Sequence, residues 1–99
     1  MRLVEAAEDL QDVFVFPNPF EAVRHGPRIM IAGLPEEATV QVLSTSGLLI
    51  RTLEERDGDG GAPWDLKDLA GRDVPSGIYL IRVEAGGLKP VLRKAAVVR

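Results

Sequence analysis

The sequence contains no cysteine and no apolar stretch long enough to form a membrane-spanning helix. The first absence excludes a disulfide framework and thiolate metal sites, and the second argues against direct membrane insertion. Histidine occurs once and aromatic residues make up 5% of the chain. A single histidine leaves a hydroxyl nucleophile little choice of an activating base, so we expect a protein that is not an enzyme.

Basic residues are neither abundant nor clustered. The chain has 12 Lys and Arg against 15 Asp and Glu, which gives a formal net charge of −3. Nucleic-acid binding depends on a concentrated basic surface, so we expect no nucleic-acid partner. Acidic residues also interrupt the first residues, which therefore do not form a signal peptide. Two interpretations follow: a complete cytosolic protein, or a domain cut from a longer exported protein.

What the chain does contain is short apolar segments separated by Gly, Pro and Asp. Residues 1–12 have a short helical pattern that is too brief for a stable isolated helix, so we expect a linker or N-terminal arm. Residues 13–99 are expected to form one domain. The spacing of the apolar segments predicts an all-β fold, an antiparallel β-sandwich of seven strands. The expected strands cover residues 13–16, 28–34, 38–44, 48–53, 62–66, 77–84 and 88–99.

Three of these segments support more specific predictions. Pro17 and Pro19 remove two N–H donors, so the first strand should lie at an edge or end there. Residues 77–84 are apolar at both alternating sets of positions, which predicts a central strand that is buried on both faces. In residues 48–53, Ile50 and Leu53 cannot share one face of a regular strand. Either a bulge or a strand buried on both sides would reconcile them.

The order of short motifs along the chain resembles a known family. The motifs are Val15-Phe16-Pro17-Asn18-Pro19-Phe20, Ile29-x-Ile31-x-x-Leu34-Pro35, Val40-x-Val42, Gly47-x-x-Ile50-Arg51-x-Leu53, Trp64-Asp65-Leu66, Gly71-x-x-Val74-x-Ser76-Gly77-Ile78-Tyr79 and Lys94-x-x-Val97-Val98-Arg99. Together they look like the C-terminal sorting domain of proteins exported by the type IX secretion system. They are similar in the same way to the immunoglobulin-like domain of the flagellar hook-capping protein.

This resemblance implies a seven-stranded antiparallel immunoglobulin-like β-sandwich at the end of a larger precursor. It implies that outer-membrane secretion machinery reads the last strands, and that an N-terminal cargo domain travels to the cell surface through the periplasm. No cofactor or metal is implied, and we expect a monomer. The residues expected to recognise the partner are Gly77, Tyr79, Arg93, Lys94, Val97, Val98 and Arg99. One departure from the family is Leu66, which stands where many relatives have Gly.

Other residues are candidates for chemistry, but a structural role explains each of them more simply. Trp64 is expected in the core rather than as a stacking platform for a sugar or peptide. Asp57, Asp59, Asp65 and Asp68 lack the ligand spacing of a calcium loop and favour turns. We expect His25 to be a surface side chain. The serines Ser44, Ser46 and Ser76 lie beside turns, and the pairs Glu36-Glu37 and Glu54-Glu55 are expected to face solvent.

The leading hypothesis is a non-catalytic C-terminal domain that directs export and surface attachment of a larger protein. Recognition would use a folded surface of the last two strands, with an open strand edge and the tail of residues 88–99 as its main parts. The alternative is a structural module that docks or stabilises a neighbouring domain. A third interpretation is carbohydrate or peptide binding through Trp64.

Overall fold

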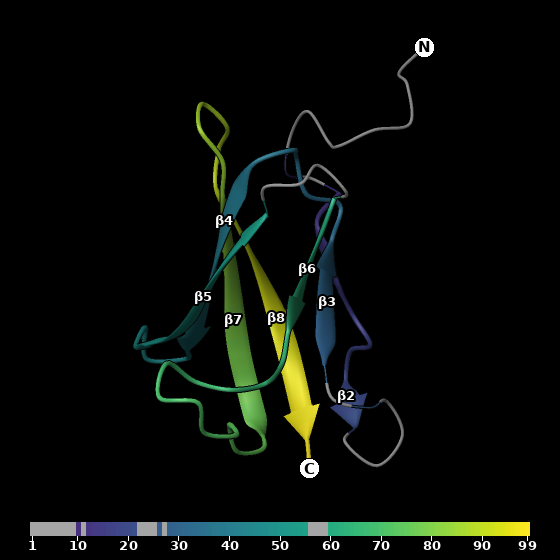
Figure 1. The fold of residues 1–99 in the computed structure, drawn as a ribbon, viewed down its shortest axis with the longest axis vertical. Helices are drawn as coiled ribbons and strands as arrows, with labels where there is room; N and C mark the ends of the chain where they lie inside the picture. Colours follow the sequence, from purple (N-terminus) through teal and green to yellow (C-terminus); the bar gives the residue numbers. More distant parts are fainter. Residues whose placement is uncertain (1–9, 11, 22–25, 27, 56–59) are drawn as a thin grey trace.

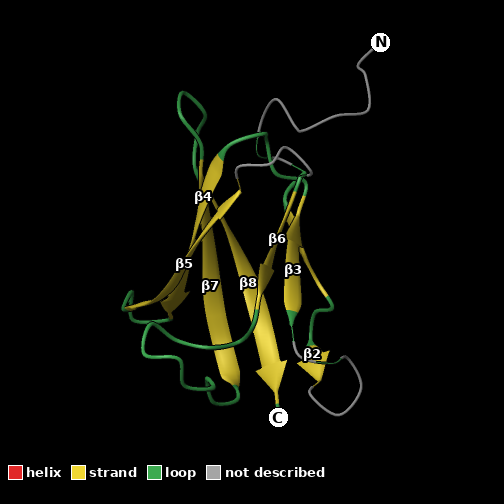
Figure 2. Cartoon of the chain, viewed as in Figure 1, coloured by secondary structure: helices red, strands yellow, loops and turns green. Residues whose placement is uncertain are grey.

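The structure is a computed structural model of the chain that describes residues 10, 12–21, 26, 28–55 and 60–99. Every regular element in these ranges is a strand, as Figure 2 shows. We find no helix in the described part of the chain that could cross a bilayer. The strands are β1 (Phe14–Phe16), β2 (Phe20–Glu21), β3 (Ile29–Ala32), β4 (Ala38–Ser44), β5 (Leu49–Glu55), β6 (Gly61–Trp64), β7 (Gly77–Glu84) and β8 (Val91–Val98).

Two sheets pack face to face, which confirms the predicted all-β sandwich (Figure 1). The smaller sheet has the order β1-β3-β6, and the larger has the order β2-β8-β7-β4-β5. The described residues form eight strands rather than the expected seven, because Phe20–Glu21 forms the short strand β2. This strand runs parallel to β8, so the sandwich is not purely antiparallel as predicted. The chain changes sheets between β1 and β2, at the segment that contains Pro17 and Pro19.

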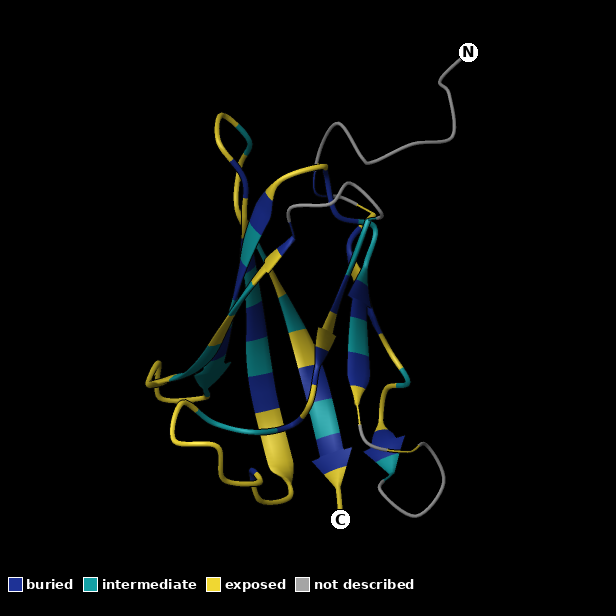
Figure 3. Cartoon of the chain, viewed as in Figure 1, coloured by how far each residue is buried: buried dark blue, intermediate teal, exposed yellow. Residues whose placement is uncertain are grey.

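The core follows from side-chain alternation along the strands. In β4, Val40 and Val42 point inward and are fully buried, while Thr39 and Gln41 lie on the outer face and are only partly buried. The same alternation produces the bands in Figure 3, where buried residues alternate with intermediate ones along β3 and most of β7, and β8 shows buried, intermediate and exposed residues in turn. Trp64 is the largest fully buried side chain. It packs against Tyr79, so the centre of the core connects β6 with β7.

A bulge resolves the irregular apolar pattern of β5. Val42 pairs with Arg51, but the next residue of β4, Leu43, pairs with Leu49, which leaves Ile50 as the extra residue. The shift allows both Ile50 and Leu53 to pack against the core from the same strand. The first of the two explanations offered by the sequence is therefore the one that the structure adopts.

Strand β7 has the predicted central position but not the predicted burial. It lies between β8 and β4 in the larger sheet, and Tyr79, Ile81 and Val83 point into the core. Its other face is not covered by a second layer, and Ile78 is 46% exposed. The prediction of a strand buried on both faces was therefore wrong, because the apolar residues of the second face lie on the outside of the sandwich.

Strand β1 forms an edge of the smaller sheet, as the two prolines after it predicted. The residues just before it also contact the domain. Leu10, within the segment expected to be an arm, is 2% exposed and belongs to the core. Gly33 has a φ of +77°, and a Cβ there would lie 2.3 Å from the carbonyl oxygen of Asp12. Only glycine allows this close approach, so Gly33 lets the backbone that leads into β1 pack directly against the end of β3.

Candidate functional site

The C-terminal hairpin, β7 and β8, carries the residues that the sequence singled out for partner recognition. The two strands pair in antiparallel register from Gly77 opposite Val97 to Val83 opposite Val91. Because side chains alternate across a strand, this register divides the predicted residues between the core and the outer face. The structure therefore does not bring all seven together on one surface.

Tyr79 and Val97 belong to the core. Their exposed fractions are 6% and 2%, so neither side chain can contact a partner from the folded domain. The Tyr79 ring meets the Trp64 ring edge to face, with 5.6 Å between centroids. Its hydroxyl donates a 2.6 Å hydrogen bond to the carbonyl oxygen of Pro75, four residues earlier. Burial raises the pKa of Tyr79 above its ordinary value of 10.0, and the nearby Arg99 charge opposes this rise.

The two arginines of the predicted set are held by backbone carbonyls of this chain. Arg93 donates from Nε to the carbonyl oxygen of Val13 at 2.8 Å. The guanidinium of Arg99 donates to the carbonyl oxygens of Val74 and Leu66, and its backbone N–H donates to Ser76 Oγ at 2.9 Å. Both side chains therefore connect the hairpin to other parts of the sandwich. Their positive charges remain near the surface, while two of the three guanidinium nitrogens of each donate hydrogen bonds within the domain.

The other three predicted residues, Gly77, Lys94 and Val98, are exposed. Lys94 and Val98 lie on the outer face of the larger sheet, where Ile78 pairs with Ala96 and Leu80 pairs with Lys94. Together these side chains form a largely apolar strip with one lysine, and the strip is bordered by Arg82, which lies on the same face opposite Leu92 and pairs with Glu84. We call it the hairpin face; it consists of Ile78, Leu80, Leu92, Lys94, Ala96 and Val98. The sequence pattern did not predict exposed positions for Ile78, Leu80 and Leu92, because apolar residues of a hairpin are expected in the core.

The hairpin face continues onto the neighbouring strands. Leu80 pairs with Leu43 of β4, and Leu43 pairs with Leu49 of β5, which is 37% exposed. On the hairpin itself, Ile78, Leu92 and Val98 are 46%, 55% and 50% exposed. Contiguous exposed apolar residues on a soluble domain commonly mark a site of contact with another protein. This strip is therefore the part of the hairpin that is accessible to a partner.

The outer edge of β8 is not open, contrary to prediction. The side-chain amide of Asn18 donates to the carbonyl oxygen of Lys94 at 2.8 Å and accepts the N–H of Ala96 at 3.0 Å. Beyond it, Phe20 and Glu21 of β2 pair with Val97 and Val98. A side chain and a two-residue strand thus occupy the positions that an added strand would need. The two prolines of Pro17-Asn18-Pro19 predict an edge position or a strand end, but they do not predict this role, for which the amide side chain between them was the available signal.

Most other candidate residues have the structural roles that the sequence favoured. Trp64 is fully buried and its Nε1 donates to the carbonyl oxygen of Lys67 at 3.0 Å, so it cannot stack on a sugar or peptide. Asp65 pairs with Arg51 at 2.8 Å. Asp68 accepts the N–H groups of Ala70 and Arg72 and so organises its turn, and these backbone hydrogen bonds, that of Arg72 foremost, lower its pKa.

The serines also act within the fold. Ser44 Oγ accepts the N–H of Leu48 and contacts Ser46 Oγ at 2.9 Å, which closes the turn between β4 and β5. Ser76 Oγ accepts the backbone N–H of Arg99. The remaining candidates His25, Asp57 and Asp59 lie outside the described residues.

The acidic pairs were predicted to face solvent, and one residue does not. Glu36, Glu37 and Glu54 are exposed, but Glu55 is only 2% exposed and accepts the N–H of Gly61 at 2.8 Å. Glu55 therefore joins the end of β5 to the start of β6. Glu55 turns inward because it lies two residues after Leu53, on the same face of β5, and pairs with the buried Ala38. The pattern of two adjacent acids does not by itself show which of them shares the inward face.

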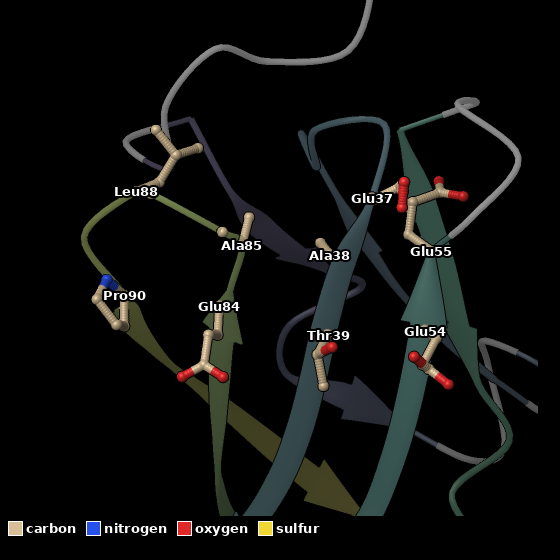
Figure 4. Close-up of a pocket in the computed structure, with 11 residues that line it drawn as sticks. Glu37, Ala38, Thr39, Glu54, Glu55, Glu84, Ala85, Leu88 and Pro90 are labelled. Atoms are coloured by element: carbon tan, nitrogen blue, oxygen red, sulfur yellow. The ribbon is translucent and has the colours of Figure 1, made fainter.

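A hollow of about 490 Å³ opens at the end of the larger sheet where the β7–β8 turn lies (Figure 4). Four glutamates from the ends of β4, β5 and β7 surround it, together with the turn residues Ala85–Leu88. Glu84 forms an ion pair with Arg82 at 2.9 Å, and Glu55 accepts a hydrogen bond from the backbone N–H of Gly61. No group of acidic or histidine side chains in the described ranges has the arrangement of a metal site. The hollow therefore offers no evident chemistry beyond its negative charge.

No protein-family model and no curated protein matches this sequence. Two solved structures contain the same fold. One is PorZ, reported as an essential bacterial surface component of the type IX secretion system of Porphyromonas gingivalis, with a TM-score of 0.80 and 29% identity over 95% of this chain. The other is dimeric latent PorU from Porphyromonas gingivalis, with a TM-score of 0.61 and 22% identity over 87% of this chain. The match spans 12% of the PorZ chain and 9% of the PorU chain, so this chain is similar to one small part of each much longer protein.

Proposed function

We propose that this chain is a non-catalytic sorting domain that directs a larger protein through the type IX secretion system to the cell surface. Similarity to part of PorZ supports the connection with this system, since the match extends over nearly the whole chain. The order of motifs in the sequence supports a sorting role. The secretion machinery of the outer membrane would be the partner, and the cargo would be a domain of the same precursor.

The hairpin face is the surface that we assign to recognition by the machinery. The single observation that carries this assignment is that Ile78, Leu92 and Val98 are about half exposed on a strand pair whose other side forms the core. The position of Lys94 among them adds one positive charge. Recognition would then use the outer face of a folded hairpin, because the β8 edge is occupied by Asn18 and β2.

The test is delivery of a reporter that carries a periplasmic signal peptide and residues 1–99 in a host with the type IX machinery. We expect Ile78→Ser combined with Val98→Ser to abolish surface delivery, because apolar contact area at the hairpin face is lost. The control is Leu69→Ser, which also removes an exposed leucine, 66% exposed, but from the loop before β7. The control should be delivered normally.

Both variants must remain folded for the comparison to hold, and thermal unfolding of each purified protein checks this. Normal delivery of the folded Ile78→Ser/Val98→Ser protein would refute recognition through this face. Deleting Lys94–Arg99 is a poorer test, since it removes Ala95 and Val97 from the core and would unfold the domain whatever its function.

The alternative, a module that docks or stabilises a neighbouring domain, is favoured by a different observation: a second apolar surface on the opposite sheet. Removing the domain from its polypeptide would then lower the stability of the neighbour without changing its location. The two functions are compatible, because they use opposite faces of the sandwich.

A further inference from the structure

The outer face of the smaller sheet consists entirely of uncharged residues. Paired residues of β1, β3 and β6 form three rows across this sheet. The middle row consists of Val15, Ile31 and Ala62, whose side chains point inward to the core. Each outward-facing residue in the other two rows has an apolar side chain or, at Gly61, no side chain. This surface, which we call the aromatic patch, consists of Phe14, Phe16, Met30, Ala32, Gly61 and Pro63.

The two phenylalanines are the main part of the aromatic patch. Phe14 is 52% exposed and Phe16 is 46% exposed, and their rings stack with 5.4 Å between centroids. Beside them, Met30 lies over Gly61, where a Cβ would come 3.2 Å from the Met30 sulfur. A shallow hollow follows, formed by Met30, Ala32, Gly60, Gly61 and Pro63. An aromatic ridge beside a hollow offers both a protrusion and a recess to an apolar partner surface.

The chemistry of the patch excludes several kinds of ligand. A sugar or a nucleotide needs hydrogen-bonding side chains, and none of the six residues supplies one. A charged peptide would find no complementary charge here. The partner surface must therefore be apolar and uncharged, as in contacts between protein domains.

The size of the patch favours a tethered partner. Two half-exposed phenylalanines and their small neighbours offer roughly 300 Å² of apolar surface. A stable complex between free proteins buries about 800 Å² on each partner, so neither a homodimer nor a separate protein would be held well by this patch alone. Domains within one chain dock through interfaces of about 300–750 Å² on each side. A linker supplies the high effective concentration that so small a contact needs.

We propose that the aromatic patch is the docking surface for the domain that precedes this one in the same polypeptide. Strand β1 is the first strand of the sandwich and also its edge strand, so a preceding domain would join through the strand that carries Phe14 and Phe16. The two similar structures contain this fold as 12% and 9% of their chains, with most of each polypeptide elsewhere. The inference rests on the proposed function only in that the chain is part of a larger protein.

Hydroxyl-radical footprinting tests this directly, because it measures oxidation of individual side chains. The 99-residue chain is compared with the complete polypeptide that its gene encodes. We expect the oxidation rates of Phe14 and Phe16 to fall severalfold in the complete polypeptide. The rates of Leu69 and Leu92, which have similar exposure in this chain, should stay the same. In the complete polypeptide, Phe14→Ser combined with Phe16→Ser should increase the radius of gyration measured by X-ray scattering, whereas Leu69→Ser should not.

Three results would overturn the proposal. One is equal oxidation of Phe14 and Phe16 in both proteins. Another is a gene that encodes no domain before residue 1. The third is dimerisation of the 99-residue chain with both phenylalanines protected, which would make a second copy the occupant. Failure of the sorting hypothesis would appear separately, as normal delivery of the Ile78→Ser/Val98→Ser reporter.

Discussion

Leu66 has a backbone conformation that non-glycine residues rarely adopt. Its φ is +64°, and among the described residues it is the one non-glycine with a positive φ. This conformation costs a residue with a Cβ about 1–2 kcal/mol. The leucine side chain is 2% exposed, and the Leu66 carbonyl oxygen accepts the N–H of Val74 and a donor from Arg99. The sorting-domain family that the motifs resemble often has Gly at this position, and the positive φ of Leu66 is a conformation that suits glycine.

We therefore expect Leu66→Gly to be less destabilising than Leu66→Ala. Both remove a buried side chain, which costs about 3 kcal/mol, but only glycine also relieves the positive φ. The expected difference is about 1 kcal/mol in the free energy of unfolding, measured with urea. The control is Ala62→Gly at a buried β6 position with ordinary φ, where glycine should be the worse residue. Equal or greater loss in Leu66→Gly than in Leu66→Ala would show that the backbone is not strained there.

Tyr79 predicts a dependence of stability on pH at alkaline values. Its pKa is raised in the folded state chiefly by burial, so the unfolded chain loses the hydroxyl proton first as pH increases. The stability that the neutral hydroxyl contributes is complete below about pH 10 and declines as pH rises through the higher folded-state pKa.

Tyr79→Phe should lower the free energy of unfolding at pH 8 by about 1 kcal/mol, because the hydrogen bond to Pro75 is lost. The difference in the free energy of unfolding between wild type and variant should then become smaller above pH 10. Urea unfolding of both proteins across this range measures it. The chain has a single tyrosine, and all other titrating groups are common to the two proteins, so a constant difference would contradict the prediction.

At the scale of the elements, the strands that follow directly from local sequence agree well with prediction. Strands β4 and β7 have the predicted limits, since strict alternation or flanking turn residues define them. Strand β2 was not predicted, because two residues between a proline and a polar loop have no pattern of their own. It exists because Phe20, 1% exposed, is anchored in the core and places the backbone beside β8.

Asn18 is the side chain that completes the edge of the larger sheet. Asn18→Ala should lower the free energy of unfolding by about 1–2 kcal/mol, since two exposed hydrogen bonds to β8 are lost. It should also increase hydrogen exchange at the Ala96 amide. Asn18→Asp keeps the acceptor for that amide but places a carboxylate oxygen against the Lys94 carbonyl oxygen.

We therefore expect Asn18→Asp to protect the Ala96 amide better than Asn18→Ala does, although both proteins are less stable than wild type. Hydrogen exchange monitored by NMR reports the protection of the Ala96 amide separately from the stability of the whole protein. Unchanged exchange of the Ala96 amide in Asn18→Ala would mean that the amide does not hold this edge of the sheet.

At the scale of the whole molecule, the sandwich has two outer faces with different properties. The larger sheet presents the hairpin face, where one lysine lies among apolar residues, and the smaller sheet presents the uncharged aromatic patch. One domain could therefore contact the secretion machinery on one side and its own cargo on the other. This arrangement would place the machinery and the cargo on opposite sides of the domain, so that neither obstructs the other.

Local sequence patterns are sufficient to predict the fold class, the central position of β7 and a first strand that either lies at an edge or ends at the two prolines. These depend on local alternation, turn residues and proline, whose effects act within a few residues. Which apolar residues of the C-terminal hairpin are buried depends instead on the packing of the two sheets. Ile78 and Val98 are as apolar as Ile81 and Val97, and one sheet can cover only one face of another. The closure of the β8 edge by Asn18 likewise depends on tertiary structure. Asn18 is separated from Lys94 by 76 positions in the chain and from Ala96 by 78 positions.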